Sequence, residues 1–142
     1  MDSTVEIYAG RPNIESMSQV LEAAERRLIE GKVPAGDRAK LLVAVDELYS
    51  NLCIHSGARN VEIRCGVSDS RVGMIFVDNG IPYNPLEQKE PDVTLPAGER
   101  VPGGLGVYLV RKTMDKVSYE YIEEKNCLTI VKEINSELLP KT

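Results

Sequence analysis

The pattern of apolar and polar positions predicts five β-strands along this chain, four of them paired in hairpins. Apolar and polar residues alternate from Thr4 to Ala9, whereas the run Val72–Val77 is continuously apolar and typical of a buried strand. Ser68-Asp69-Ser70 and Glu123-Glu124-Lys125-Asn126 have the polar composition of hairpin loops. The predicted strands cover residues 4–9, 60–67, 71–78, 117–122 and 127–134.

Apolar residues at helical spacing predict three helices between these strands. The first helix follows Asn13, whose side chain can cap it, and runs to about Glu30. The second starts at Pro34-Ala35-Gly36-Asp37, with the aspartate as its cap, and ends at Ser56-Gly57. The third opens at Gly104-Leu105-Gly106. The buried stripe of the second helix consists of Leu41, Leu42, Val45, Leu48, Tyr49 and Leu52.

The order of these elements predicts an α+β fold rather than repeated βαβ units. Prolines and glycines interrupt every possible element between Gly80 and Gly104, and we interpret residues 83–103 as a functional lid. The tail, about residues 135–142, is expected to fray. Residues 1–142 would then form one domain. It would be a two-layer sandwich, with a mostly antiparallel sheet of about five strands covered on one face by three helices.

Composition narrows the possible partners and the cellular location. The 142 residues carry a net charge of -5, which argues against nucleic acid or an anionic membrane as the main partner. No apolar run approaches the ~20 residues that span a bilayer, and the N-terminus lacks a signal peptide, so we expect a cytoplasmic protein. Three widely spaced cysteines and a single histidine argue against a zinc site and favour free, buried thiols.

Glu47 and Asn51 place a carboxylate and an amide on one face of the second helix, because residues four apart differ by only ~40° in direction. An amide oxygen suits Mg²⁺, which takes few protein ligands and completes its shell with phosphate oxygens. A glutamate can accept the proton of an attacking hydroxyl. His55 extends this face by one turn and can contact phosphate. A solvated helix flank or a structural histidine would give the same pattern.

Two glycine-containing segments border the interpreted lid. Asp78-Asn79-Gly80 sets a carboxylate at the end of a buried strand beside a glycine that admits a ligand, although an ordinary Asn-Gly turn fits equally. Gly103-Gly104-Leu105-Gly106 opens a helix whose free N–H groups can bind phosphate, although a flexible lid end also fits. Arg100 can reach a terminal phosphate or remain solvated.

Taken together, three motifs resemble those of the GHKL (Bergerat-fold) ATP-binding superfamily. Glu47-Leu48-Tyr49-Ser50-Asn51-Leu52-Cys53-Ile54-His55 resembles its N-box. Val77-Asp78-Asn79-Gly80-Ile81-Pro82-Tyr83-Asn84-Pro85 resembles its first glycine box, and Gly103-Gly104-Leu105-Gly106-Val107-Tyr108-Leu109-Val110-Arg111-Lys112 its second. Within the superfamily, the Pro-Tyr-Asn-Pro stretch and the second box are similar to the bacterial anti-sigma-factor serine/threonine kinases, although the stretch is Pro-Phe-Asp-Pro in those proteins.

The resemblance implies the Bergerat fold, ATP and Mg²⁺ as cofactors, and roles for particular residues. Asp78 would bond the adenine amino group, Asn51 would hold Mg²⁺, Glu47 would be the general base, and Arg100 a second catalytic residue. The implied nucleotide contacts are Asn51, His55, Asp78, Gly80, Pro82, Gly103, Gly104, Leu105, Gly106 and Val107.

The resemblance also implies a function in transcription regulation. A protein of this kind binds a sigma factor and phosphorylates a serine on an anti-anti-sigma (STAS-domain) partner, in many cases as a homodimer. The alternative is a non-catalytic binding module that exchanges partners according to nucleotide occupancy without transferring phosphate. The catalytic domain of a histidine kinase fits less well, because the sequence has no helical hairpin with a phosphoacceptor histidine, and its one histidine lies on the predicted site helix.

Overall fold

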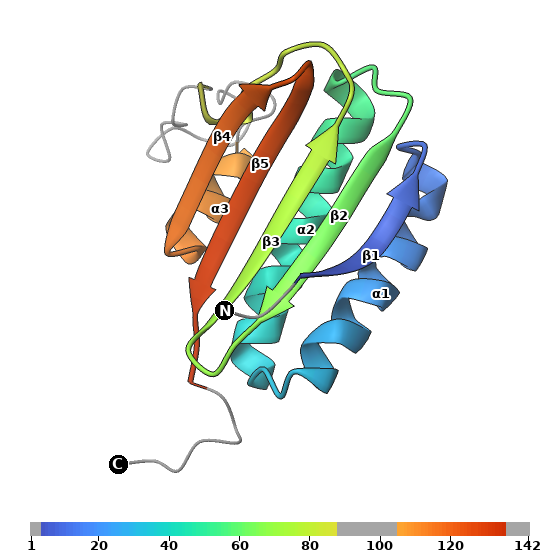
Figure 1. Cartoon of the computed structure of the whole chain (residues 1–142). Coiled ribbons are helices and arrows are strands. Elements are labelled where there is room, and N and C mark those ends of the chain that lie inside the picture. The colour runs from blue at the N-terminus through green and yellow to red at the C-terminus, as the bar shows by residue number, and fades with distance from the viewer. Residues whose placement is uncertain (1–3, 88–104, 136–142) are drawn as a thin grey trace.

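The computed structural model describes residues 4–87 and 105–135 (Figure 1). In chain order the elements are β1 (Val5–Gly10), η1 (Ile14–Ser16), α1 (Met17–Glu30), α2 (Ala35–His55), β2 (Val61–Val67), β3 (Arg71–Asp78), η2 (Pro85–Glu87), α3 (Leu105–Thr113), β4 (Lys116–Ile122) and β5 (Lys125–Glu133). Most of the predicted lid and the tail from residue 136 onward lie outside the described residues, so both interpretations stay predictions.

The five strands form one antiparallel sheet in the order β1-β2-β3-β5-β4. Tight turns join β2 to β3 and β4 to β5, while the central pair, β3 and β5, is distant in sequence. All three α-helices lie on one face of the sheet (Figure 1). The predicted α+β architecture, with an antiparallel sheet and helices on one face, is thus confirmed.

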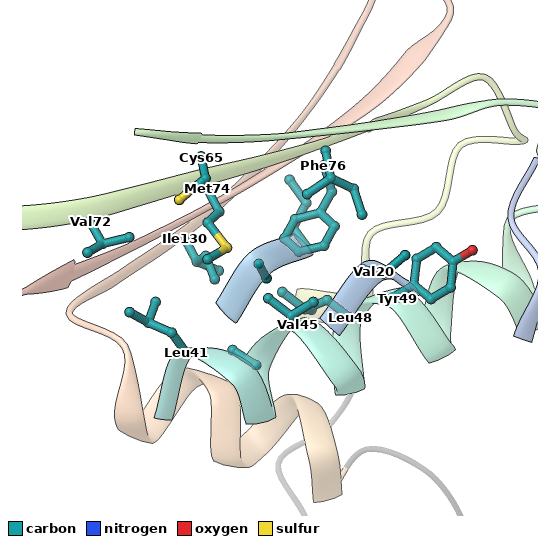
Figure 2. Close-up of a cluster of buried hydrophobic side chains, with 14 of the residues drawn as sticks. Val20, Leu41, Val45, Leu48, Tyr49, Cys65, Val72, Met74, Phe76 and Ile130 are labelled. Atoms are coloured by element: carbon teal, nitrogen blue, oxygen red, sulfur yellow. The ribbon is translucent and has the colours of Figure 1, made fainter. Parts of the chain in front are cut away.

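The core lies between the sheet and α2, and strict alternation along the strands builds it. Every second residue of β3 is buried, namely Val72, Met74, Phe76 and finally Asp78. The apolar members of this row face the α2 side chains Leu41, Val45 and Leu48 (Figure 2). Asp78 therefore continues a hydrophobic row, which places a carboxylate on the helix-covered side of the sheet.

The start of α2 corrects one prediction. Asp37 is not the helix cap, because α2 begins at Ala35 directly after Pro34. Asp37 instead lies in the first turn, where a carboxylate is favoured by the helix dipole. Its Oδ1 is 3.5 Å from Nζ of Lys132, which also lies 3.6 Å from Oδ2 of Asp115. The aspartate thus ties α2 to β5. Asn13 is a cap as predicted, but of η1, the short 3-10 helix that precedes α1: its Oδ1 accepts the backbone N–H of Glu15 at 2.9 Å, while Ser16 precedes α1 and makes no side-chain cap bond.

The turn between β4 and β5 is shorter than predicted. Only Glu123 and Glu124 form it, with φ angles of 52° and 63°. Two successive residues at positive φ give the turn type that matches the twist of a two-residue hairpin. Lys125 and Asn126, for which the polar pattern predicts a loop, belong to β5. This shift places Asn126 directly opposite Asp78 in the β3–β5 register.

Two further observations concern membrane-spanning helices and the three cysteines. In the part of the chain that the structure describes, no helix has both the length and the apolar character needed to cross a membrane. Cys53, Cys65 and Cys127 are all free thiols, and only Cys65 is fully buried. Burial raises the pKa of the Cys65 thiol to about 11, so that it stays protonated at neutral pH.

Candidate functional site

A cavity lies where the end of β3, the last turns of α2 and the start of β5 meet. Its volume is about 30 Å³. The lining residues are Leu48, Asn51, Leu52, Ser56, Phe76, Asp78, Tyr83, Pro85, Tyr119, Asn126 and Leu128. Apolar side chains thus form most of the wall, and a few polar groups converge on it, as is typical of small-molecule sites.

Asp78 is the buried charged group of this cavity, with an exposed fraction of 6%. Its Oδ1 accepts the backbone N–H of Gly80 at 2.9 Å and Nδ2 of Asn126 at 3.0 Å. Among the described residues, none donates to Oδ2. Oδ2 is not among the fully buried side-chain atoms that lack a hydrogen-bond partner, so it is accessible and can accept a donor that a ligand brings.

Asn126 is the site residue that the sequence analysis missed. It is only 4% exposed. Besides Asp78, its Nδ2 donates to the carbonyl oxygen of Ile81 at 2.8 Å, while its Oδ1 accepts the backbone N–H of Tyr83 at 3.0 Å and the Tyr119 hydroxyl. Burial raises the pKa of that hydroxyl, which keeps it a donor at neutral pH. The only sequence signal was a polar residue near the start of a strand.

Gly80 is required by close packing between the turn after β3 and the end of α2. A β-carbon at this position would lie 2.2 Å from the carbonyl oxygen of Ser56. That same oxygen accepts the N–H of Ile81 at 2.9 Å. Oδ1 of Asn79 accepts the backbone N–H groups of Arg59 and Asn60, both at 2.9 Å. The Asp-Asn-Gly segment is therefore held on both sides, which fixes the carboxylate of its first residue.

Glu47 meets the beginning of α3. A β-carbon on Gly106 would lie 1.9 Å from Oε2 of Glu47 and 2.5 Å from its Cδ, so the half-buried carboxylate packs directly on the glycine. Gly106 is the second residue of α3, and the N–H groups of a first helical turn have no partner within the helix. The structure thus brings together the predicted base and the part of the predicted phosphate-binding segment that it describes.

Asn51 and His55 follow on the same helix. Asn51 lines the cavity and, within the described part of the chain, its side chain makes no hydrogen bond. His55 is exposed and stacks on the ring of Tyr83, with centroids 5.0 Å apart and planes at 22°. Tyr83 itself lines the cavity, so His55 contacts a residue of the cavity wall.

The other predicted contacts divide into two groups. Pro82 is exposed after the turn, and Val107 is 5% exposed in α3, which begins at Leu105. Arg100, Gly103 and Gly104 lie outside the described residues. The roles assigned to all these residues stay predictions.

The groups that line this cavity suit a purine base, although the cavity is smaller than such a base. The unpartnered oxygen of Asp78 can accept a donor such as an exocyclic amino group, and the apolar walls suit a flat base. A volume of about 30 Å³ has room for one or two water molecules rather than a base. Of the residues that line the cavity, Tyr83 is partly exposed and stacks on His55.

Comparisons with known proteins agree with the fold. The sequence matches the histidine kinase-like ATPase domain family over residues 11–132. No curated protein matches it in sequence. The chain is similar to the structure of the mycobacterial sensor histidine kinase MprB, at 16% identity and a TM-score of 0.50, covering 96% of this chain and 99% of that one. It is also similar to the catalytic domain of histidine kinase ThkA in a nucleotide-free form, at 14% identity and a TM-score of 0.52, covering 94% and 100%.

These two structures share the fold, and the family match carries the assignment further. It extends over all the described site residues, from Glu47 on α2 through Asp78 on β3 to Asn126 on β5. The chain therefore belongs to the histidine kinase-like ATPase domain (GHKL) family, whose members bind ATP.

Proposed function

We propose that this protein is an ATP-dependent protein-serine kinase of the anti-sigma-factor type. It would bind a sigma factor and phosphorylate a serine of a STAS-domain partner. The observation that carries the kinase part is the contact between the Glu47 carboxylate and Gly106 at the start of α3. The partners rest on the resemblance of the Pro82–Pro85 stretch and of the second glycine box to those kinases.

The chain's own groups divide into a base-binding side and a phosphate side. Asp78 would accept the adenine amino group, and the N–H groups of the first turn of α3 would bind phosphate. ATP supplies the phosphoryl group when bound. Glu47 would accept the proton of the incoming serine hydroxyl, since its carboxylate already lies at that helix end.

Magnesium fits the phosphate side only together with the nucleotide. Among the described residues, no three His, Cys, Asp or Glu side chains gather where they could hold a metal ion. Asn51 offers one amide oxygen at the cavity wall, and no described residue competes for it. A cation that keeps several waters and relies on phosphate oxygens matches such a sparse donor set.

The proposal can be tested by phosphate transfer from radiolabelled ATP. A STAS-domain protein that co-purifies with the chain from its native host would be incubated with wild type, with Glu47→Gln and with Asp46→Asn. Asp46 is the matched control, because it is an adjacent carboxylate that points elsewhere on α2 and is exposed, at 3.4 Å from the Ser50 hydroxyl.

We expect labelling by wild type and Asp46→Asn, and a loss of about 100-fold or more in Glu47→Gln, the usual effect of removing a general base. If the partner binds but no variant labels it, the protein is a nucleotide-dependent binding module and the kinase proposal is wrong. If Glu47→Gln transfers phosphate as fast as wild type, Glu47 is not the base.

A further inference from the structure

Asn126 occupies a position at which every one of its polar atoms is used. As an amide it has two N–H donors and one oxygen acceptor. The donors face only acceptors, on Asp78, Ile81 and, at 3.5 Å, Gly80. The oxygen faces only donors, the N–H of Tyr83 and the hydroxyl of Tyr119. This arrangement fixes the orientation of the amide without ambiguity. A fully satisfied amide is what burial to 4% requires.

Strand pairing fixes the position of Asn126. The β3–β5 ladder pairs Asp78 with Asn126, so that their side chains leave the same face of the sheet. The left-handed backbone of Glu123 and Glu124 sets the β4–β5 register that brings Tyr119 into reach. The amide thus joins β3, β4, β5 and the turn after β3.

The bond from Asn126 has a direct consequence for Asp78. A carboxylate on its own can rotate between two nearly equivalent orientations, because this torsion is broad and two-fold. Here Oδ1 accepts both the N–H of Gly80 and Nδ2 of Asn126, at 2.9 and 3.0 Å. One oxygen is therefore saturated by the protein, and only Oδ2 remains without a donor from the described residues.

We infer that Asn126 is a positioning residue that sets the base specificity of the site through Asp78. It does not need to touch the nucleotide. By donating to Oδ1, Asn126 holds the carboxylate so that Oδ2 alone contacts the base. This orientation favours binding of a purine with an exocyclic amino group. This inference rests on the proposed recognition of adenine by Asp78.

The same amide connects base recognition to the segment that follows. Its Oδ1 accepts the N–H of Tyr83, whose ring stacks on His55 at the cavity wall. A change in the orientation of Asn126 would therefore move both the carboxylate and this wall. We expect the loss of the amide to weaken discrimination between bases more than it weakens attraction for the triphosphate.

The test compares two ligands that differ by one amino group, ATP and purine riboside triphosphate. Their dissociation constants would be measured calorimetrically with Mg²⁺ for wild type, Asn126→Leu and Tyr119→Phe. Leucine keeps the size of the side chain and removes its hydrogen bonds. Tyr119→Phe is the control for the ratio of the two constants, because it removes a donor to the same amide while leaving the bond to Asp78 intact. Tyr119 also lines the cavity, so this variant can weaken both ligands, and only their ratio is compared.

For wild type we expect ATP to bind on the order of 10- to 100-fold more tightly than the analogue, the range for a hydrogen bond to a charged group. In Asn126→Leu this preference should fall to within about threefold, whereas Tyr119→Phe should keep it. A purely structural role would weaken both ligands equally and leave their ratio unchanged. An unchanged ratio in Asn126→Leu overturns the inference, while the pocket assignment stands.

Two further outcomes are decisive. If wild type shows no preference for ATP, Asp78 does not read the amino group, and the adenine site itself is wrong. If Asn126→Leu does not fold, hydrogen exchange of the Asn126 side-chain amide in wild type replaces it. Exchange should be slower with ATP than with the analogue, and equal exchange with both ligands would refute the coupling.

Discussion

Replacing Gly106 by alanine should impair phosphoryl transfer while leaving the protein as stable as before. The new β-carbon would lie 1.9 Å from Oε2 of Glu47, whereas an ordinary contact begins at 3.4 Å. The carboxylate must therefore retreat by about 1.5 Å, the difference between these two distances. Because these atoms are the far end of a flexible, half-buried side chain, the retreat costs only about 1 kcal/mol as a rotamer change.

That cost is offset by helix propensity, since alanine is favoured over glycine in a helix by about 1 kcal/mol. We therefore expect the free energy of unfolding to change by less than about 1 kcal/mol. Catalysis is far more sensitive, because a misplacement of about 1 Å in a catalytic group can cost roughly 100-fold in rate. Urea unfolding would measure the first quantity, and single-turnover transfer from radiolabelled ATP the second.

Gly36 provides the control. It too is the second residue of its helix, α2, but a β-carbon there meets nothing within 4 Å. Gly36→Ala should gain about 1 kcal/mol of stability and transfer phosphate at the wild-type rate. The reasoning would be refuted if Gly106→Ala also transferred at the wild-type rate, because the carboxylate would then not be needed where the structure places it.

Four further outcomes follow from the structure. Gly80→Ala should destabilise the fold by about 1–3 kcal/mol in urea unfolding, because its β-carbon meets the backbone of Ser56, which cannot move aside; an unchanged midpoint would contradict this. Glu124→Gly should raise stability by about 1 kcal/mol by relieving a left-handed backbone, and a lower melting temperature would count against it. The backbone N–H of Glu133 lowers the pKa of Asp115. The charged carboxylate therefore stabilises the folded protein above the ordinary carboxyl pKa, and this contribution is lost as the pH falls through the lowered pKa. Between pH 7 and 3, the free energy of unfolding of Asp115→Asn should accordingly fall less than that of wild type. Cys65 should resist iodoacetamide at pH 8 until the protein unfolds, as mass spectrometry can show, and rapid labelling of the native protein would contradict its burial.

Much of the fold could be predicted because it depends on periodicity. Alternation along β3 sets the row that ends in Asp78, and helical spacing sets the face of α2 that packs on it. Glu47 stood out in the sequence by residue type and position, although only the structure shows that it touches Gly106. This contact joins α2 and α3, which are far apart in sequence, so no local sequence pattern predicts it.

Asn126 could not be predicted, because local residue preferences contradict the turn that positions it. Two glutamates at positive φ are unfavourable, so Glu123 to Asn126 looked like a longer polar loop. The sheet overrides that preference by pairing Asn126 with Asp78. The capping prediction for Asp37 failed for a related reason, since its partner Lys132 comes from the other end of the chain.

The sheet order also has a consequence for folding kinetics. The hairpins β2–β3 and β4–β5 close across short turns and should form early, whereas pairing β3 with β5 must bring together the ends of residues 79–124. The contact between Asp78 and Asn126 belongs to this late step. A chain with both hairpins formed but not yet joined lacks the proposed base-binding site. Nucleotide therefore cannot rescue such a partly folded chain, and it should slow unfolding without speeding folding.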